Sequence, residues 1–218
     1  MFSSELDGHC DDNSRGWVHD ANEDDENDED NEDDIAFDIE TTGLNPDEEG
    51  KEITVACTWG KNRNNTYFFT RPGYDREANI ENFCKELDSA RRIYGFNADK
   101  FDLPWVVKKF NIDQNRASQW FLKLFDYFQI CKLVFDSSCS LNNLLKANGM
   151  TPKISSGMQA VIWANTGEFE KLGEYCLDDA RLTWLISIRK EVVLPLTRQK
   201  PVVYRKHNGS WNFKQIEL

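Results

Sequence analysis

The first apolar segment of the chain, residues 35–40, alternates with a period of two and predicts a β-strand. Its odd-numbered positions hold isoleucine and phenylalanine, whereas Asp38 and Glu40 fall together on the other side. Two like charges side by side on an apolar strand are costly to desolvate unless a cation lies between them. Because Gly43 ends the strand, the pattern indicates a divalent metal site near a strand end, although the pair alone also fits a solvated strand face.

Further segments predict the rest of a mixed sheet. Residues 53–59 and 66–70 are rich in β-branched and aromatic residues, with a polar turn between them. With the first strand they predict a three-stranded antiparallel meander. Residues 92–96 predict a fourth strand that returns beside the first. Residues 124–126 predict a fifth, within a segment (121–128) whose pattern also fits a helix.

Apolar residues at helical spacing predict the helices between and after these strands. One helix includes Ile80 to Leu87, and another begins near Asp102 with Pro104 in its first turn. The remaining predicted helices cover residues 141–147 (with Ser140 as N-cap), 158–163 and 168–193, and a β-hairpin is predicted over 202–213. The expected fold class is α/β, a mixed five-stranded sheet flanked by helices.

The net charge of -12 is concentrated near the N-terminus. Residues 1–34 hold 15 acidic residues and one arginine, whereas the remaining 184 residues hold 23 acidic and 25 basic residues. Such an acidic segment cannot bury enough apolar surface to offset its ordering entropy, so we expect a disordered tail. It serves either as a solubilising tail or as a segment that repels nucleic acid or occupies a basic groove until displaced. We expect the folded domain over 35–197 and a C-terminal extension over 198–218.

Several classes of protein are not supported by the sequence. No apolar run approaches a membrane span and the N-terminus does not resemble a signal peptide, so we expect a soluble intracellular protein, cytoplasmic or nuclear. Six cysteines without a C-x2-C pair indicate reduced core residues. The three histidines, His9, His19 and His207, offer no centre for a serine or cysteine triad, and no phosphate-binding G-x-x-x-x-G-K-[ST] loop is present.

Three acidic segments stand in a distinctive order. Residues 37–44 read FDIETTGL, residues 97–102 read NADKFD and residues 175–180 read YCLDDA. Together they resemble the three exonuclease motifs of the DEDD superfamily of 3′-to-5′ exonucleases, in the subgroup that has tyrosine in the third motif. They are most similar to the proofreading domain of family-B DNA polymerases. The resemblance spans roughly residues 35–195 and implies a ribonuclease H-like fold.

The resemblance implies a set of catalytic residues. Asp38, Glu40, Asp102 and Asp179 would hold two divalent cations, Mg²⁺ or Mn²⁺, with Asp38 bridging both ions. Tyr175 would orient the attacking water and the scissile phosphate. Independently of the family, Tyr175 and Asp179 are four residues apart on a predicted helix and therefore lie on one face. Carboxylates and water are the ligands that these hard cations prefer.

The resemblance also implies residues that contact substrate. Thr41, Thr42 and Leu44 match positions that grip the terminal nucleotide. Asn97 and Phe101 match the second motif, where Asn97 either contacts substrate or fixes its loop and Phe101 more simply packs.

Three charged residues near these motifs are open to a structural interpretation. Asp126 fits no ligand position of the motif and is interpreted as structural. Lys153 lies in a loop from which it could reach phosphate, although most loop lysines have no such role. Asp178 is expected to face solvent or to pair with Arg181.

The leading functional hypothesis is a stand-alone, metal-dependent 3′-to-5′ exonuclease that acts on single-stranded DNA and releases nucleoside 5′-monophosphates. Two alternatives stay open: an exoribonuclease, and an inactive subunit that binds nucleic acid or assists assembly. The expected partner is nucleic acid with a free 3′ end. A replication or repair protein could bind the acidic tail or the C-terminal extension.

Overall fold

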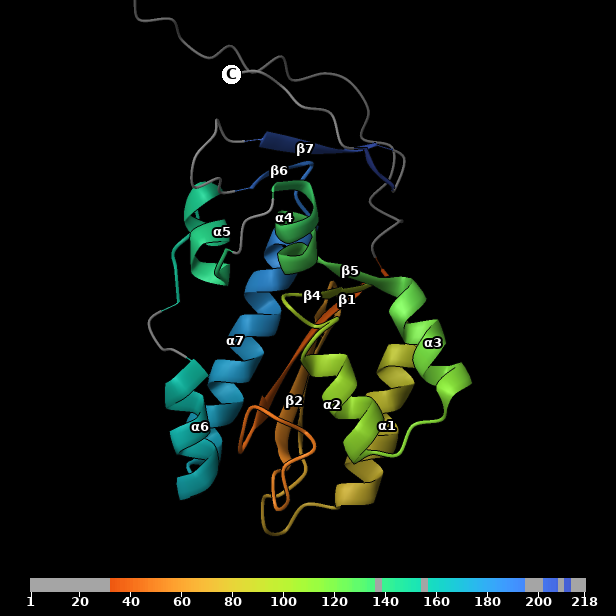
Figure 1. The fold of residues 1–218 in the computed structure, drawn as a ribbon, viewed down its shortest axis with the longest axis vertical. Coiled ribbons are helices and arrows are strands. Elements are labelled where there is room, and N and C mark those ends of the chain that lie inside the picture. Colours follow the sequence, from red (N-terminus) through yellow and green to blue (C-terminus); the bar gives the residue numbers. More distant parts are fainter. Residues whose placement is uncertain (1–31, 136–138, 154–156, 195–201, 208–209, 213–218) are drawn as a thin grey trace, which may run out of the picture.

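The computed structural model describes residues 32–135, 139–153, 157–194, 202–207 and 210–212 of the chain. A mixed five-stranded sheet with the order β3-β2-β1-β4-β5 forms its centre (Figure 1). The strands are β1 (Ile35–Thr41), β2 (Ile53–Gly60), β3 (Arg63–Phe68), β4 (Ile93–Gly95) and β5 (Leu124–Asp126). β2 is antiparallel to both β1 and β3, whereas β4 is parallel to β1 and to β5. The predicted mixed sheet, with its antiparallel meander and parallel strands, is confirmed.

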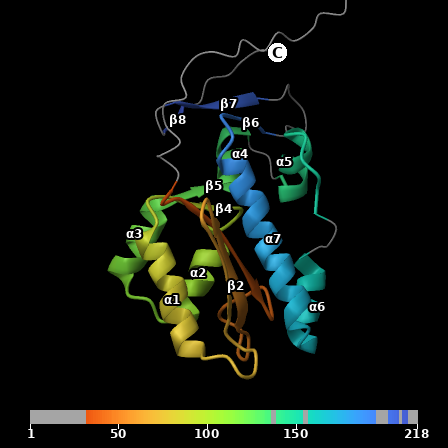
Figure 2. The ribbon, with the colours of Figure 1, turned by 180° about the vertical axis from the view of Figure 1, so that it is seen from behind.

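Helices cover both faces of this sheet (Figures 1 and 2). On one side lie α1 (Arg76–Ser89), α2 (Asp102–Lys109) and α3 (Gln114–Lys123), and on the other lie α6 (Gly157–Thr166) and α7 (Phe169–Ser187). The odd-numbered side chains of β1 are buried in a cluster with α1 and α2. The opposite face of β2 packs against α7. Both faces of β1 and β2 are therefore buried, which is why these strands expose so few side chains.

A second set of elements packs near the C-terminal end of α7. It comprises α4 (Tyr127–Phe135), α5 (Leu141–Ala147), β6 (Glu191–Leu194), β7 (Val202–His207) and β8 (Ser210–Asn212). β6, β7 and β8 form a separate antiparallel sheet. Most of the predicted acidic tail, and parts of the predicted C-terminal extension, lie outside the described residues. None of the described helices is both long and apolar enough to span a membrane.

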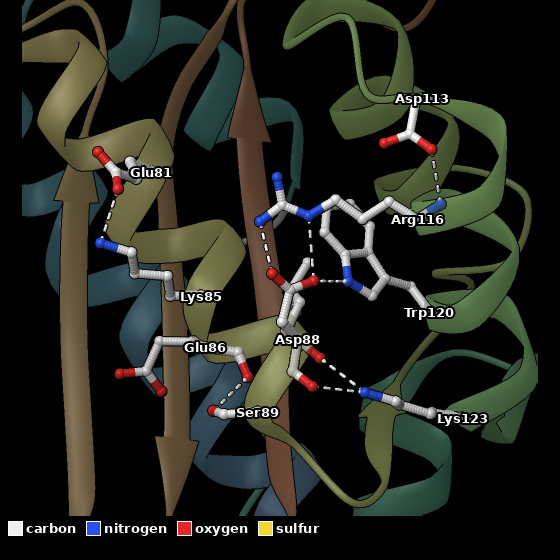
Figure 3. Close-up of polar contacts among 10 residues, drawn as sticks. Glu81, Lys85, Glu86, Asp88, Ser89, Asp113, Arg116, Trp120 and Lys123 are labelled. Carbon is white, nitrogen blue, oxygen red and sulfur yellow. Dashed lines mark hydrogen bonds and ion pairs between the residues drawn. The ribbon is translucent and has the colours of Figure 1, made fainter.

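The helix α3 has no counterpart in the sequence prediction. Its N-cap is Asp113, whose carboxylate accepts the Asn115 and Arg116 amide N–H groups, and its buried residues Ala117 and Trp120 are three apart. Figure 3 shows how its side chains meet the end of α1. They are held by Asp88, which accepts two hydrogen bonds from Arg116 and one from the Trp120 indole at 2.8 Å. This network fixes α3 against α1.

The predicted third strand, 66–70, is wrong at both ends. β3 begins at Arg63, which pairs with Gly60, so the turn takes only two residues. β3 is the edge strand of the sheet, and its first residues keep their polar side chains accessible while their backbone pairs with β2. The polar residues 63–65 therefore belong to the strand and not, as predicted, to the turn.

The predicted end of the last helix, Val193, is also wrong. α7 ends at Ser187 with Ile188 as its C-cap, and residues 191–194 form β6. Val192 and Val193 are β-branched and favour a strand. Their partners are Val203 and Tyr204 of β7, which a local helical pattern does not reveal.

The described cysteines confirm the prediction of reduced core residues. Cys57, Cys84, Cys131, Cys139 and Cys176 are buried free thiols.

Candidate active site

The first two candidate ligands lie side by side on β1. The odd-numbered residues of β1 face α1 and α2, which leaves Asp38 and Glu40 on the face toward α7. Glu40 is buried, and the Oδ2 atom of Asp38 is inaccessible although the residue as a whole is half-buried. The pairing register with β2 shifts between Glu40 and Thr41, so the strand is irregular immediately after the second carboxylate.

The helix α7 brings Tyr175 and Asp179 against this pair of carboxylates. Gly173 permits the close approach, because a Cβ atom there would lie 2.8 Å from the ring of Phe68 on β3. One turn of α7 further on, the Cys176 thiol donates to the main-chain carbonyl oxygen of Asp38 at 3.3 Å. Both Tyr175 and Asp179 are buried. The predicted i, i+4 placement is thus realised on a helix that lies directly on the sheet.

Three of the four predicted ligands converge. One carboxylate oxygen each from Asp38, Glu40 and Asp179 lies within 4.8 Å of the other two. Asp38 Oδ2 and Asp179 Oδ1 are buried without a hydrogen-bond partner within the described part of the chain. Buried carboxylate oxygens that lack donors are costly unless a cation compensates them. This hard, oxygen-only donor set therefore fits Mg²⁺ or Mn²⁺.

The fourth predicted ligand, Asp102, is outside that group of three but close to it. Asp102 is the first residue of α2 and is buried. Its Oδ1 accepts the main-chain N–H of Ile39, the residue between the two β1 carboxylates, at 3.1 Å. Burial raises its pKa to about 7, against the hydrogen bond from Ile39, which lowers it.

Burial raises the pKa of every carboxyl group in the cluster, and repulsion between the carboxylates adds to it for Asp38 and Glu40. Burial is the largest cause for Asp38, followed by the charges of Asp179 and Glu40. For Glu40 it is burial and then the charge of Asp179. The pKa of Asp179 is raised as well, because burial outweighs the opposing effect of Lys153. In the absence of cations, the folded protein therefore favours protonated carboxyl groups here.

These shifts predict a pH-dependent stability. A carboxyl group whose pKa is raised on folding stabilises the fold fully below its unfolded pKa, and this contribution is lost as the pH rises through the folded pKa. For Asp102 that window runs from its usual 3.8 to about 7. We expect the melting temperature in EDTA to fall between pH 5 and pH 8, and Mg²⁺ to restore it most at pH 8. Differential scanning fluorimetry checks this, with Asp102→Asn as a control that flattens the dependence; a melting temperature that rises with pH in EDTA contradicts it.

Asp126 holds the loop that delivers Asp102, which agrees with its interpretation as structural. Its carboxylate accepts the N–H groups of Asn97 at 2.9 Å and Asp99 at 2.8 Å, and those of Phe128 and Gln129 at the start of α4. Asn97 has a φ of 68°, and its carbonyl oxygen accepts the Phe101 N–H. The Asn97 backbone thus shapes the turn, a conformation that asparagine tolerates well.

We expect Asp126→Ala to destabilise the fold by about 3 kcal/mol, because it leaves several N–H groups without their acceptor. Hydrolytic activity should fall with it, since the loop before Asp102 loses its support. Urea unfolding measures the first effect. The matched control is Asp99→Ala, which removes a neighbouring carboxylate that is paired with Lys100 at the surface. Equal stability of the two variants would contradict this role.

Lys153 is the site residue whose role the sequence left open. Its ammonium group donates to the Tyr175 hydroxyl at 2.7 Å and to Asp179 Oδ2 at 2.5 Å. Asn142 of α5 fixes its backbone, donating to the Lys153 carbonyl oxygen and accepting the Lys153 N–H. The sequence around Lys153 contains no local pattern that predicts these contacts, because the contacts depend on how the segment after α5 lies against α7.

The predicted substrate-contacting residues differ in how far their side chains are already used within the fold. At the end of β1 the Thr41 hydroxyl donates to the Gly43 carbonyl oxygen, and in the loop that follows the Thr42 hydroxyl accepts the Glu52 N–H. Leu44 projects from the same loop and is 78% exposed. Phe101 is half-buried against the core beside Trp105, which agrees with packing.

A cleft of about 750 Å³ adjoins the cluster. Lys153 and Tyr175 lie on its wall together with Trp163 of α6, whereas none of the four carboxylates lines it. Further along the cleft, Arg181 pairs with Asp178 at 2.6 Å, as the sequence suggested for Asp178. The cleft therefore reaches the site from the side of Tyr175.

The site is a carboxylate cluster set on the central strand of a mixed sheet and completed by a helix, a donor set that suits divalent cations. The chain belongs to the RNase_H superfamily, whose family model matches residues 35–189. A solved structure with a similar fold is that of the family B DNA polymerase from the hyperthermophilic archaeon Pyrobaculum calidifontis. The TM-score is 0.53 and the sequence identity is 17%, over 69% of this chain and 23% of the polymerase chain. A search of curated proteins found no match. The superfamily and the site together support nuclease activity.

Proposed function

We propose that the protein is a metal-dependent 3′-to-5′ exonuclease of the tyrosine-type DEDD group that hydrolyses single-stranded DNA to nucleoside 5′-monophosphates. The observation that carries the proposal is the convergence of Asp38, Glu40 and Asp179 beside the Tyr175 hydroxyl, with two buried carboxylate oxygens lacking donors. The resemblance of the three sequence motifs to those of the tyrosine-type DEDD group supports both the membership of that group and the 3′-to-5′ direction of hydrolysis. The similar fold in a family B DNA polymerase favours DNA as the substrate.

The residues present fit the roles that such a reaction requires. Asp38, Glu40 and Asp179 would hold one or two divalent cations, with Asp102 as a further ligand. When bound, such ions activate water and neutralise the charge that develops on the phosphate and on the leaving 3′-oxygen. The Tyr175 oxygen accepts a hydrogen bond from Lys153, and the Tyr175 proton is donated to Asp179, so both partners hold the hydroxyl beside the carboxylate cluster. Burial and the charge of Asp179 raise the pKa of Tyr175, so its hydroxyl keeps that proton at neutral pH.

Digestion of end-labelled oligonucleotides tests the proposal. With Mg²⁺ or Mn²⁺, a 3′-labelled single strand should release its label first as a mononucleotide, while a 5′-labelled strand should give a ladder that shortens with time. EDTA should stop both. Matched RNA strands serve as the comparison, and faster RNA digestion would replace DNA by RNA as the substrate. Cleavage of circular single strands, or no hydrolysis with either ion, would overturn the exonuclease proposal.

A further inference from the structure

The helix α6 has an apolar face that no described residue covers. Met158 is 79% exposed and Ile162, one turn later, is 49% exposed. On its other side α6 is packed: Ala160 is fully buried, and the Trp163 ring contacts the Tyr175 ring edge to face at 6.1 Å between centroids. The helix therefore carries apolar side chains on two sides but needs only one of them for folding.

The uncovered face lies beside the loop after β1. Asn165 is almost two full turns from Met158 and therefore shares its side of the helix. The Asn165 amide donates to the main-chain carbonyl oxygen of Thr42 at 3.4 Å, which ties this side of α6 to the loop that follows the β1 carboxylates. Leu44 projects from the same loop. In Figure 1, α6 lies beside α7 on the side of the molecule where this loop emerges.

The chemistry of this face suits nucleobases. α6 contains no acidic or basic residue, so it forms no ion pair with a charged peptide or with a phosphate. Base faces are largely apolar, so aliphatic side chains can pack against them with little regard to sequence, and methionine adapts its shape to different partners. Lys153, which precedes α6 in the chain, is directed at Asp179 and Tyr175, where a phosphate would lie. Bases and phosphates of one strand would thus meet different sides of the site.

We propose that Met158 and Ile162 form a platform on which unpaired bases near the 3′ end of the substrate strand pack, and that this platform selects single strands. The proposal rests on the proposed function and adds to it the surface that recognises unpaired bases. In a duplex the base faces are already stacked and paired, so they cannot cover the platform. The platform therefore gives affinity to any single-stranded sequence and none to a duplex end.

The test measures binding, so that it does not depend on hydrolysis. Fluorescence anisotropy in EDTA gives Kd for a single-stranded ten-nucleotide DNA, for the same strand with abasic sites at its last three positions, and for a blunt duplex. The variant is Met158→Gln with Ile162→Gln, which keeps good helix formers on an exposed face. The control is Leu122→Gln, which alters an equally exposed leucine on α3, across the sheet from α6.

We expect the α6 double variant to raise Kd for the ordinary single strand roughly tenfold, about the effect of no longer burying most of one apolar side chain. Its Kd for the abasic strand and for the duplex should match that of the parent. An unchanged Kd for the ordinary strand, or the same rise on the abasic strand, would overturn the platform. A parent that binds single strands through α6 but hydrolyses nothing would overturn the proposed function alone.

Discussion

An Asp38→Asn variant is expected to lose hydrolysis by roughly 10³-fold or more, with Kd for single-stranded DNA changed only modestly. Asp38 lies close to both Glu40 and Asp179, and its Oδ2 accepts no hydrogen bond from the described residues. Cations held here would act mainly on the transition state and would supply several kcal/mol, and each ~1.36 kcal/mol is a factor of ten in rate. Single-turnover hydrolysis of an end-labelled strand measures the loss.

The same variant should be more stable than the parent in EDTA, because it removes one charge from a cluster of mutually repelling carboxylates. Loss of hydrolysis together with a raised melting temperature would show that Asp38 serves as a metal ligand and is not needed for folding. The matched control is Asp178→Asn on α7, where the carboxylate pairs with Arg181 outside the cluster. If Asp38→Asn digested DNA as fast as Asp178→Asn, Asp38 would not be a ligand, and an inactive binding subunit would become the better interpretation.

A Lys153→Met variant is expected to lower kcat roughly 10²-fold, the usual cost of removing one preorganised donor from such a site. The methionine keeps the apolar stem of the side chain but removes the ammonium group that donates to Tyr175 and Asp179. Less Mg²⁺ should be needed for half-maximal activity, because a positive charge that competes for Asp179 has gone. The combination of a lower kcat and a lower Mg²⁺ requirement in the variant would identify Lys153 as a donor that also competes with the ions for Asp179.

Lys171→Met provides the comparison, since Lys171 lines the same cleft but pairs with Glu168 at the surface. Kinetics over a range of Mg²⁺ concentrations give both quantities for the two variants. Identical rates and identical Mg²⁺ requirements would show that Lys153 serves neither the tyrosine nor the ions.

The parts of the site that could be predicted from sequence are those that depend on a local period. Alternation along β1 placed Asp38 and Glu40 on one side, and helical spacing placed Tyr175 and Asp179 on one face. Both placements need only the backbone geometry of a single element. The order of the first four strands also followed, because the short connection from β1 to β2 favours a hairpin and the longer path to β4 permits a parallel return.

The parts that could not be predicted depend on contacts between distant segments. Lys153 reaches Tyr175 only because Asn142 fixes the backbone after α5, and Asp126 supports Asp102 from a strand that is 24 residues further along the chain. The helix α3 had a readable N-cap in Asp113, but its pattern was obscured by the exposed Leu122. The strand β6 continues a helical pattern and forms because a partner strand is available.

The start of β1 sets a limit on how far the chain can be shortened. Asp34 is completely buried, and its carboxylate accepts two hydrogen bonds from Arg91 and one from the Tyr94 hydroxyl. Asp33 adds a main-chain bond, with its carbonyl oxygen accepting the Arg91 N–H. A truncated form for crystallisation should therefore retain Asp33 and Asp34, since a chain that begins at Ile35 would lose the hydrogen bonds that join the start of β1 to Arg91 and Tyr94.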